Sequence, residues 1–125
     1  MLHGEARLPL ERDPTAASDA RQSVRRFCAD MPRDLQTTAQ LLTSELVTNA
    51  LQHGDGAIEL QLRADPTALR VEVSDESPER PQRMNASAGS VSGRGMLLVE
   101  ALASSWGILS HPGDGKAVWF ELRRR

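Results

Sequence analysis

The hydrophobic period of this sequence changes at Gly54 and Gly56, and the change divides the chain into two kinds of structure. Before these glycines, apolar residues recur at helical spacing in two runs, which Pro32 separates. After them, apolar and polar residues alternate one by one, as in a strand with one buried face. A chain of 125 residues suits one domain, which we take as residues 1–125, so both kinds of element must share one core.

Two helices are expected before the change. The first follows Asp13, a good N-cap, and Pro14, which suits the first helical position, and it ends before Pro32. The second runs from about Asp34 to His53 and stops at the glycines. The apolar stripes of the two helices are Ala16, Ala20, Val24, Phe27, Cys28 and Met31 in the first, and Leu35, Ala39, Leu42, Leu46 and Ala50 in the second.

Strands are expected at residues 6–10, 58–62, 69–73, 107–110 and 116–122. The second and third of these should form an antiparallel hairpin, with Asp65 and Pro66 at its turn. A further helix should begin near Gly93. Strands joined by hairpins, with helices to cover one face, predict an α+β fold: a two-layer sandwich whose sheet is mixed but mostly antiparallel.

Charge and cysteine content argue against several classes of partner. A formal net charge of -2 gives no support for direct binding to nucleic acid or to an anionic membrane. No apolar run approaches the roughly 20 residues that cross a bilayer, and Glu5 and Arg7 stand where a signal peptide needs apolar residues. The one cysteine, Cys28, excludes an intrachain disulfide and a thiolate metal cluster. We therefore expect a cytoplasmic protein.

The end of the second helix carries the first residues suited to chemistry. Glu45, Asn49 and His53 are spaced i, i+4 and i+8, so they form one stripe beside the apolar face. A carboxylate there can take a proton from a hydroxyl group or from water, and an amide oxygen is a suitable ligand for Mg²⁺. A solvated polar flank has the same spacing, with the histidine favoured by the helix dipole. The stripe alone leaves both interpretations open.

Asp75 is the second candidate, because strand parity places it on the apolar face of its strand. A carboxylate at the end of such a face needs a partner, and the exocyclic amine of a purine would serve. A turn-capping aspartate that bends back to solvent would fit the position equally well.

The third candidate is the glycine-rich stretch from Ser92 to Met96, which leads into the last helix. Gly93 and Gly95 let backbone N–H groups approach a phosphate at a helix N-terminus, and Arg94 adds a charge-assisted contact. A flexible hinge before a helix would use the same residues.

The order of these segments is more specific than any one of them. A helix with Glu-x-x-x-Asn, a strand ending in aspartate, a loop and a glycine-rich helix start together resemble the Bergerat ATP-binding fold of the GHKL, or histidine-kinase-like, ATPase family. Ser44–Gly54 resembles the family's N-box. Val71–Pro78, Gly93–Gly107 and Lys116–Leu122 resemble the adenine box, last helix and final strand of its small actinobacterial-type members. The likeness covers nearly the whole chain, Ala6–Leu122, and is specific to the stand-alone anti-sigma-factor serine-kinase branch.

The resemblance implies a role for each matching residue. Asn49 would hold the Mg²⁺ that bridges the phosphates of ATP, Glu45 would be the general base, and Asp75 would bind the adenine amino group. The loop from about Glu76 to Ser92 would be an ATP lid, which excludes water when it closes. The other residues that these motifs imply for nucleotide binding are His53, Ser77, Gly93, Arg94, Gly95 and Met96.

The function that the resemblance implies is that of an anti-sigma factor with protein serine kinase activity. Such a protein binds a sigma factor, phosphorylates an anti-anti-sigma partner of the STAS type, and is a homodimer. The catalytic domain of a histidine kinase is a poorer match, because none of His3, His53 and His111 lies on a preceding two-helix dimerisation unit.

Two departures from the family pattern favour an alternative, a non-catalytic, nucleotide-dependent regulator of transcription that binds other proteins. Ser77 stands where the adenine box usually has glycine, and Ala117 stands where a threonine usually precedes the final Val-Trp-Phe. A missing threonine hydroxyl near the adenine should weaken ATP binding by about 0.5–1.5 kcal/mol.

Overall fold

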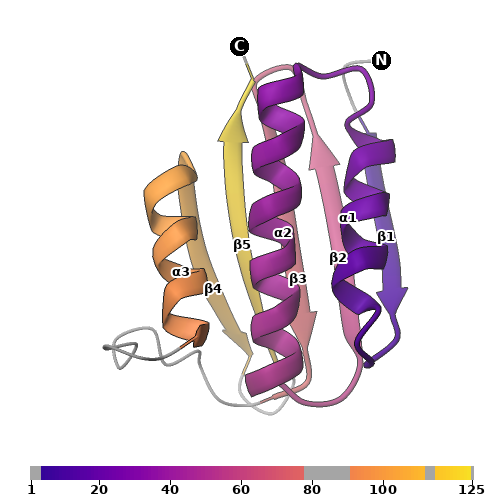
Figure 1. The fold of residues 1–125 in the computed structure, drawn as a ribbon, viewed down its shortest axis with the longest axis vertical. Coiled ribbons are helices and arrows are strands. Elements are labelled where there is room, and N and C mark those ends of the chain that lie inside the picture. The colour runs from indigo at the N-terminus through magenta and orange to yellow at the C-terminus, as the bar shows by residue number, and fades with distance from the viewer. Residues whose placement is uncertain (1–3, 78–90, 112–114, 125) are drawn as a thin grey trace.

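The computed structural model describes residues 4–77, 91–111 and 115–124, with the backbone alone given for 91–96 and 111. Within these ranges the elements follow the predicted order of strand, two helices, two strands, helix and two strands (Figure 1). Their bounds are β1 Gly4–Leu10, α1 Ala16–Phe27, α2 Arg33–His53, β2 Ile58–Ala64, β3 Ala68–Asp75, α3 Val91–Leu102, β4 Ser105–His111 and β5 Gly115–Arg123.

The strands form one sheet in the order β1-β2-β3-β5-β4, and all three helices lie on one face of it (Figure 1). This arrangement confirms the predicted α+β two-layer sandwich. The sheet was expected to be mixed, but all four pairings between the described strands are antiparallel. Because α3 carries the chain past β5 to the edge, β4 runs along the outside and β5 returns between β4 and β3.

The start of α1 differs from the prediction. Asp13 is not the N-cap, because the helix begins at Ala16 with Thr15 before it. The Asp13 carboxylate instead accepts hydrogen bonds from the Thr15 hydroxyl (2.5 Å) and the Thr15 backbone N–H (2.9 Å), which lower the pKa of Asp13. Asp13 therefore closes a turn before the helix. The predicted stripe is otherwise confirmed: Ala16, Ala20, Val24, Cys28 and Met31 are buried, and Phe27 is partly buried.

α2 is the central helix, between α1 and α3 and over the middle of the sheet (Figure 1). Since it is covered on both flanks, it buries more than one narrow stripe. None of the helices in the described ranges is both long and apolar enough to cross a membrane. The buried residues of α2 are Ala39, Leu42, Thr43, Leu46, Val47, Asn49 and Ala50.

The C-terminal end of α2 is held by Arg12, which precedes α1. Its guanidinium donates hydrogen bonds to the backbone oxygens of Ala50 (3.2 Å), Leu51 (3.2 Å) and Gly56 (2.8 Å). The last carbonyl groups of a helix lack intrahelical partners and carry partial negative charge, so a cation there stabilises the end. Arg12 thus fixes the part of α2 that carries the predicted chemistry.

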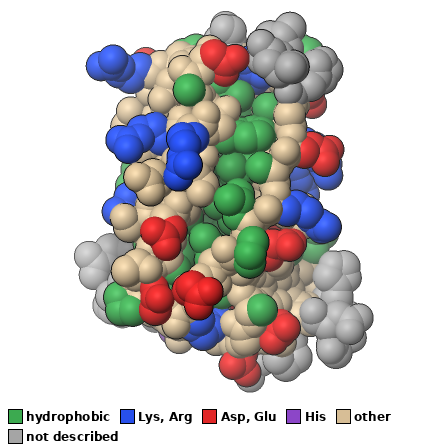
Figure 2. Space-filling view, turned by 90° about the vertical axis from the view of Figure 1, so that its right-hand side faces the viewer, with side chains coloured by type: hydrophobic (Ala, Val, Ile, Leu, Met, Phe, Trp, Pro, Cys, Tyr) green, Lys and Arg blue, Asp and Glu red, His purple; other side chains and the backbone are tan. Residues whose placement is uncertain are grey.

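β1 is an edge strand, where a proline such as Pro9 is tolerated. A view onto this edge shows hydrophobic side chains along the seam between α1 and β1, with charged side chains around them (Figure 2). The apolar residues of these two elements that remain only partly buried are Ala6, Leu8, Leu10, Ala17 and Phe27.

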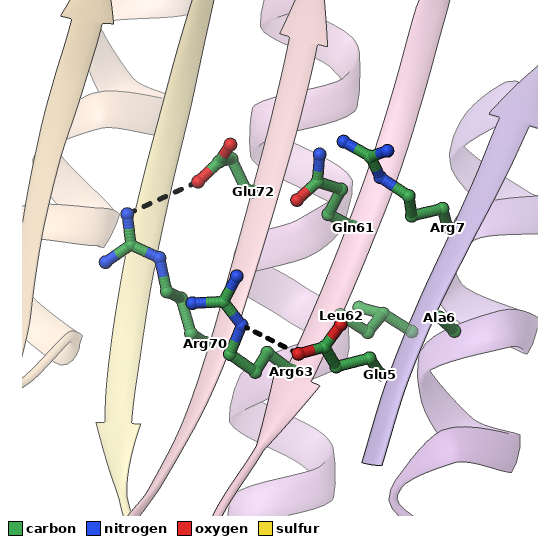
Figure 3. Close-up of a pocket in the computed structure, with 8 residues that line it drawn as sticks. All are labelled: Glu5, Ala6, Arg7, Gln61, Leu62, Arg63, Arg70 and Glu72. Atoms are coloured by element: carbon green, nitrogen blue, oxygen red, sulfur yellow. Dashed lines mark hydrogen bonds and ion pairs between the residues drawn. The ribbon is translucent and has the colours of Figure 1, made fainter.

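The sheet face that carries no helices is lined by charged side chains. Arg70 lies 4.0 Å from the centre of the Trp119 ring and pairs with Glu72 and Glu121, each at 3.3 Å. Arg63 pairs with Glu5 at 3.5 Å across a shallow pocket on the same face (Figure 3). The Arg63–Glu5 pair is exposed, and exposed pairs contribute little to stability, whereas the Arg70 pairs are partly buried. The residues that the sequence predicts to bind a ligand or to act in catalysis do not line this pocket.

Candidate functional site

One end of the molecule collects the segments that the sequence singled out. The C-terminal end of α2, the end of β3, the start of β5 and the start of α3 all lie at this end (Figure 1). The hairpin between β2 and β3 and the antiparallel pairing of β3 with β5 produce this convergence. Segments that are far apart in sequence thus share one site.

The stripe on α2 runs from partly buried to exposed. Glu45 is partly buried, Asn49 is 6% exposed, and His53 is exposed at the last residue of the helix. Neither the Glu45 carboxylate nor the Asn49 amide has a hydrogen-bond partner among the residues that the structure describes. The Asn49 amide is therefore available to a ligand, although Thr43 Oγ1 is the only completely buried polar side-chain atom without a hydrogen-bond partner in the described part of the chain.

The described residues contain no group of three His, Cys, Asp or Glu side chains that could hold a metal ion. Mg²⁺ needs few protein ligands when phosphates and water supply the others. A single amide at Asn49 is therefore compatible with a magnesium–nucleotide complex, but not with a cation bound by protein side chains alone.

Asp75 lies where strand parity predicts, on the buried face at the end of β3. The Lys116 ammonium donates to both of its carboxylate oxygens, at 2.9 Å to Oδ1 and 2.7 Å to Oδ2. Each side chain is 3% exposed. The Ser77 backbone N–H also donates to Oδ1, at 2.7 Å. The carboxylate predicted to bind adenine thus has a partner from its own chain.

Two glycines allow this arrangement. A Cβ atom at Gly54 would lie 2.4 Å from Asp75 Oδ2 and 2.5 Å from the Ala50 oxygen, so the Asp75 carboxylate packs against the end of α2. At Gly115 a Cβ atom would lie 2.2 Å from the Asp75 backbone oxygen, and its φ of +102° also favours glycine. Gly54 was predicted to end a helix, and its bare Cα also makes room for Asp75.

α3 begins at Val91, two residues before the predicted start. Gly93, Arg94, Gly95 and Met96 therefore lie within the first turns of the helix and not in a segment that precedes it. The first N–H groups of a helix have no intrahelical partner, so this end still suits a phosphate. The side chains of Arg94 and Met96, and residues 78–90 of the predicted lid, lie outside the described part of the chain.

Lys116 begins the motif Lys116–Leu122, but it was not predicted to be a site residue. Its position was visible in the sequence, because it shares strand parity with Val118, Phe120 and Leu122, and it is the only lysine in the chain. The same parity bears on Ala117, whose predicted effect on ATP binding stays a prediction. Ala117 pairs with Ser74 and alternates with the buried-face residues, so a hydroxyl there would lie on the opposite face of the sheet from Asp75.

Comparison with known proteins agrees with this geometry. Residues 10–122 match the family model for the histidine kinase-like ATPase domain. No curated protein matches the chain in sequence.

Two solved structures are similar in fold. One contains the RsbU and RsbW domains of Rv1364c from Mycobacterium tuberculosis, with a TM-score of 0.73 and 22% identity, and the match covers 97% of this chain and 32% of that one. The other is the histidine kinase domain of the EL346 blue-light activated histidine kinase from Erythrobacter litoralis, with a TM-score of 0.52 and 21% identity, over 86% of this chain and 59% of that one. On the family match, this chain belongs to the histidine kinase-like ATPase domain family.

Proposed function

We propose that this chain is an ATP- and Mg²⁺-binding regulator of the anti-sigma type, which phosphorylates a serine of a STAS-type anti-anti-sigma protein. The observation that carries the proposal is Asn49, a residue 6% exposed whose amide has no described hydrogen-bond partner, at the end of the molecule where β3, β5 and α3 also converge. The likeness to a structure that includes an RsbW domain is consistent with this branch of the family.

Each residue of the site has a proposed task. Bound Mg²⁺–ATP would supply the phosphoryl group and a metal ion that stabilises the charge of the transfer. Asn49 would bind the metal ion, and Glu45 would accept the proton of the serine hydroxyl. Glu45 suits that task because it is partly buried and no cation neutralises it among the described residues. The proposed contacts to the nucleotide come from His53, Asp75, Ser77, Gly93, Arg94, Gly95 and Met96.

The proposal includes protein partners in the cytoplasm: a sigma factor, the STAS-type substrate and a second copy of the chain. The seam between α1 and β1 supports the homodimer, because it leaves apolar side chains partly exposed beside an unpaired strand edge (Figure 2). This seam lies on the opposite side of the molecule from α3 (Figure 1). A dimer formed there would leave the start of α3 accessible.

One observation favours the second candidate, a regulator that binds its partners without catalysis. The Asp75 carboxylate is already bound by Lys116 within the chain, so the residue expected to recognise adenine is not free to do so. A protein of this kind would respond weakly to ATP and would still bind a sigma factor.

Phosphate transfer separates the two candidates. The purified chain, a STAS-type protein and ATP labelled at the γ-phosphate are incubated with Mg²⁺, and label on the STAS-type protein is measured. We expect transfer by the native chain and a loss of about 10²–10⁴-fold with Glu45→Gln, because general base catalysis contributes that much. Glu11→Gln, an exposed carboxylate outside the site, is the matched control.

Equal transfer by the native chain and Glu45→Gln would contradict the role of Glu45 as the general base. Absence of transfer from a native chain that binds both ATP and the partner would favour the non-catalytic candidate instead.

A further inference from the structure

The ion pair between Asp75 and Lys116 joins the end of β3 to the start of β5. The two residues face each other directly in the antiparallel register, and both side chains lie on the face that the helices cover. At 3% exposure each, the carboxylate and the ammonium are almost completely removed from water. Charges buried this deeply need each other, so the contact is a fixed feature of the folded chain.

The carboxylate has little capacity left for another donor. Oδ1 accepts from the Ser77 backbone and from Lys116, and Oδ2 accepts from Lys116 at the shorter distance, 2.7 Å. Gly54 closes off the side of Oδ2 that faces α2, where even a Cβ atom would not fit. An amino group that approaches Asp75 therefore competes with an ammonium that is already in place.

The Lys116 ammonium has a third N–H donor that neither carboxylate oxygen accepts. It carries three N–H donors and no acceptor, and the two carboxylate oxygens take two of them. No further partner for Nζ lies among the residues that the structure describes. The pair as a whole thus presents a buried donor at the position where the base of a nucleotide is expected.

Purine bases differ in what they offer to such a donor. Adenine carries an amino group at position 6, which is a donor, whereas guanine carries a carbonyl oxygen there, which is an acceptor, beside an N–H donor at position 1. Adenine also carries an acceptor nitrogen at position 1. At position 6, however, the amino group of adenine would meet the ammonium donor to donor, whereas the guanine carbonyl could accept a hydrogen bond from it.

We propose that Lys116 determines which base the site prefers. Its ion pair with Asp75 prevents the carboxylate from binding adenine, which lowers the affinity for ATP. The same ammonium raises the relative affinity for nucleotides with an acceptor at position 6 of the base. This inference rests on the proposed nucleotide site and adds a specificity residue to it. The displacement of Lys116 by adenine would leave a buried carboxylate without its partner, which opposes ATP binding.

The test compares nucleotide affinities. Calorimetry gives the Kd of Mg²⁺–ATP and Mg²⁺–GTP for the native chain and for Lys116→Met, which keeps the length of the side chain and removes the charge and donors. We expect ATP to bind more tightly and GTP more weakly to the variant, so that the ratio of the two Kd values shifts by about tenfold or more, the worth of one good hydrogen bond. Arg123→Met, which removes an exposed cation from the same strand, should leave the ratio unchanged.

A second measurement uses the native chain alone. Because Lys116 is the only lysine, a chain labelled with ¹³C at the lysine ε-carbon gives one lysine signal in the NMR spectrum. This signal should shift as GTP or ATP saturates the site. A signal that stays unchanged while calorimetry records binding would overturn the inference, even if Lys116→Met did not fold.

The two proposals fail in different ways. If native and Lys116→Met chains bind both nucleotides with the same Kd ratio, the inference is wrong and the nucleotide site stands. If neither chain binds either nucleotide at millimolar concentration, the nucleotide site is wrong and the inference falls with it.

Discussion

Lys116 is buried because Asp75 is buried beside it. An ammonium group is strongly hydrated, and its removal from water is unfavourable unless an opposite charge and hydrogen bonds replace the water. The register of β3 and β5 supplies both, by setting the two residues opposite each other. Removing either partner leaves the other charge uncompensated, so the pair contributes to the stability of this end of the sheet.

Cys28 provides a test of burial in the core. The thiol is 0% exposed, and burial raises its pKa from 9.0 to about 11, with Arg124 acting in the opposite direction. Because the pKa is raised in the folded state, the contribution of the protonated thiol to the free energy of unfolding is fully present below pH 9. As the pH rises from 9 to 11, the free energy of unfolding falls by about 1.4 kcal/mol per pH unit.

Urea denaturation at pH 8 and pH 10 measures this loss. The native chain should lose roughly 1.3 kcal/mol more stability between the two values than Cys28→Ala does, since the variant lacks the titrating group. Equal losses would show that the thiol is not buried as the structure describes.

α2 carries the candidate site residues Glu45, Asn49 and His53, and its C-terminal end is stabilised by Arg12, which lies outside the helix. Arg12 donates to three backbone oxygens at this end, including those of Ala50 and Leu51 inside the helix. Asn49 lies immediately before these residues, so a frayed helix end would move it. The connection between β1 and α1 therefore supports the site without touching it.

Replacement of Arg12 by Met should lower the free energy of unfolding by about 1 kcal/mol, because a cation near a helix C-terminus and the hydrogen bonds that it makes contribute on that order. Arg123→Met is the control, since Arg123 is an exposed arginine on β5 whose side chain has no hydrogen-bond partner among the described residues. Urea denaturation compares the two. A loss for Arg12→Met no larger than that for Arg123→Met would contradict the role of Arg12.

The helices and strands could be predicted because their apolar periods are unambiguous. α2 was expected from about Asp34 to His53 and runs from Arg33, and the β2–β3 hairpin forms as the alternation indicated. The start of α1 was wrong, because Asp13 has a competing use in a turn that closes on Thr15. Local hydrogen bonds of this kind leave no trace in the apolar period.

At the scale of the whole molecule, the candidate site lies at one end of the two-layer sandwich (Figure 1). The order of motifs along the chain was enough to predict the fold and to name Asn49 and Asp75. It did not reveal the partner of Asp75, because a contact between β3 and β5 depends on the register of strands 41 residues apart. The motifs drew attention to Ser77 and Ala117 and not to the ion pair of Asp75 with Lys116, although Lys116 begins the final-strand motif.

Replacement of Asn49 by Ala should separate an effect on nucleotide binding from an effect on the stability of the chain. Its amide makes no described hydrogen bond, so Asn49→Ala breaks none and should leave the free energy of unfolding of the free chain close to that of the native one. Any loss of nucleotide binding in this variant will then report the site and not a folding defect.

The central claim is that this end of the sandwich binds Mg²⁺–ATP through Asn49, and calorimetric titration of the native chain, Lys116→Met and Asn49→Ala tests it most directly. We predict that the native chain binds, that Lys116→Met binds more tightly, and that Asn49→Ala loses at least about tenfold in affinity, the worth of about 1.4 kcal/mol. Unchanged affinity in Asn49→Ala would contradict the claim, as would the absence of binding in both the native chain and Lys116→Met at millimolar ATP.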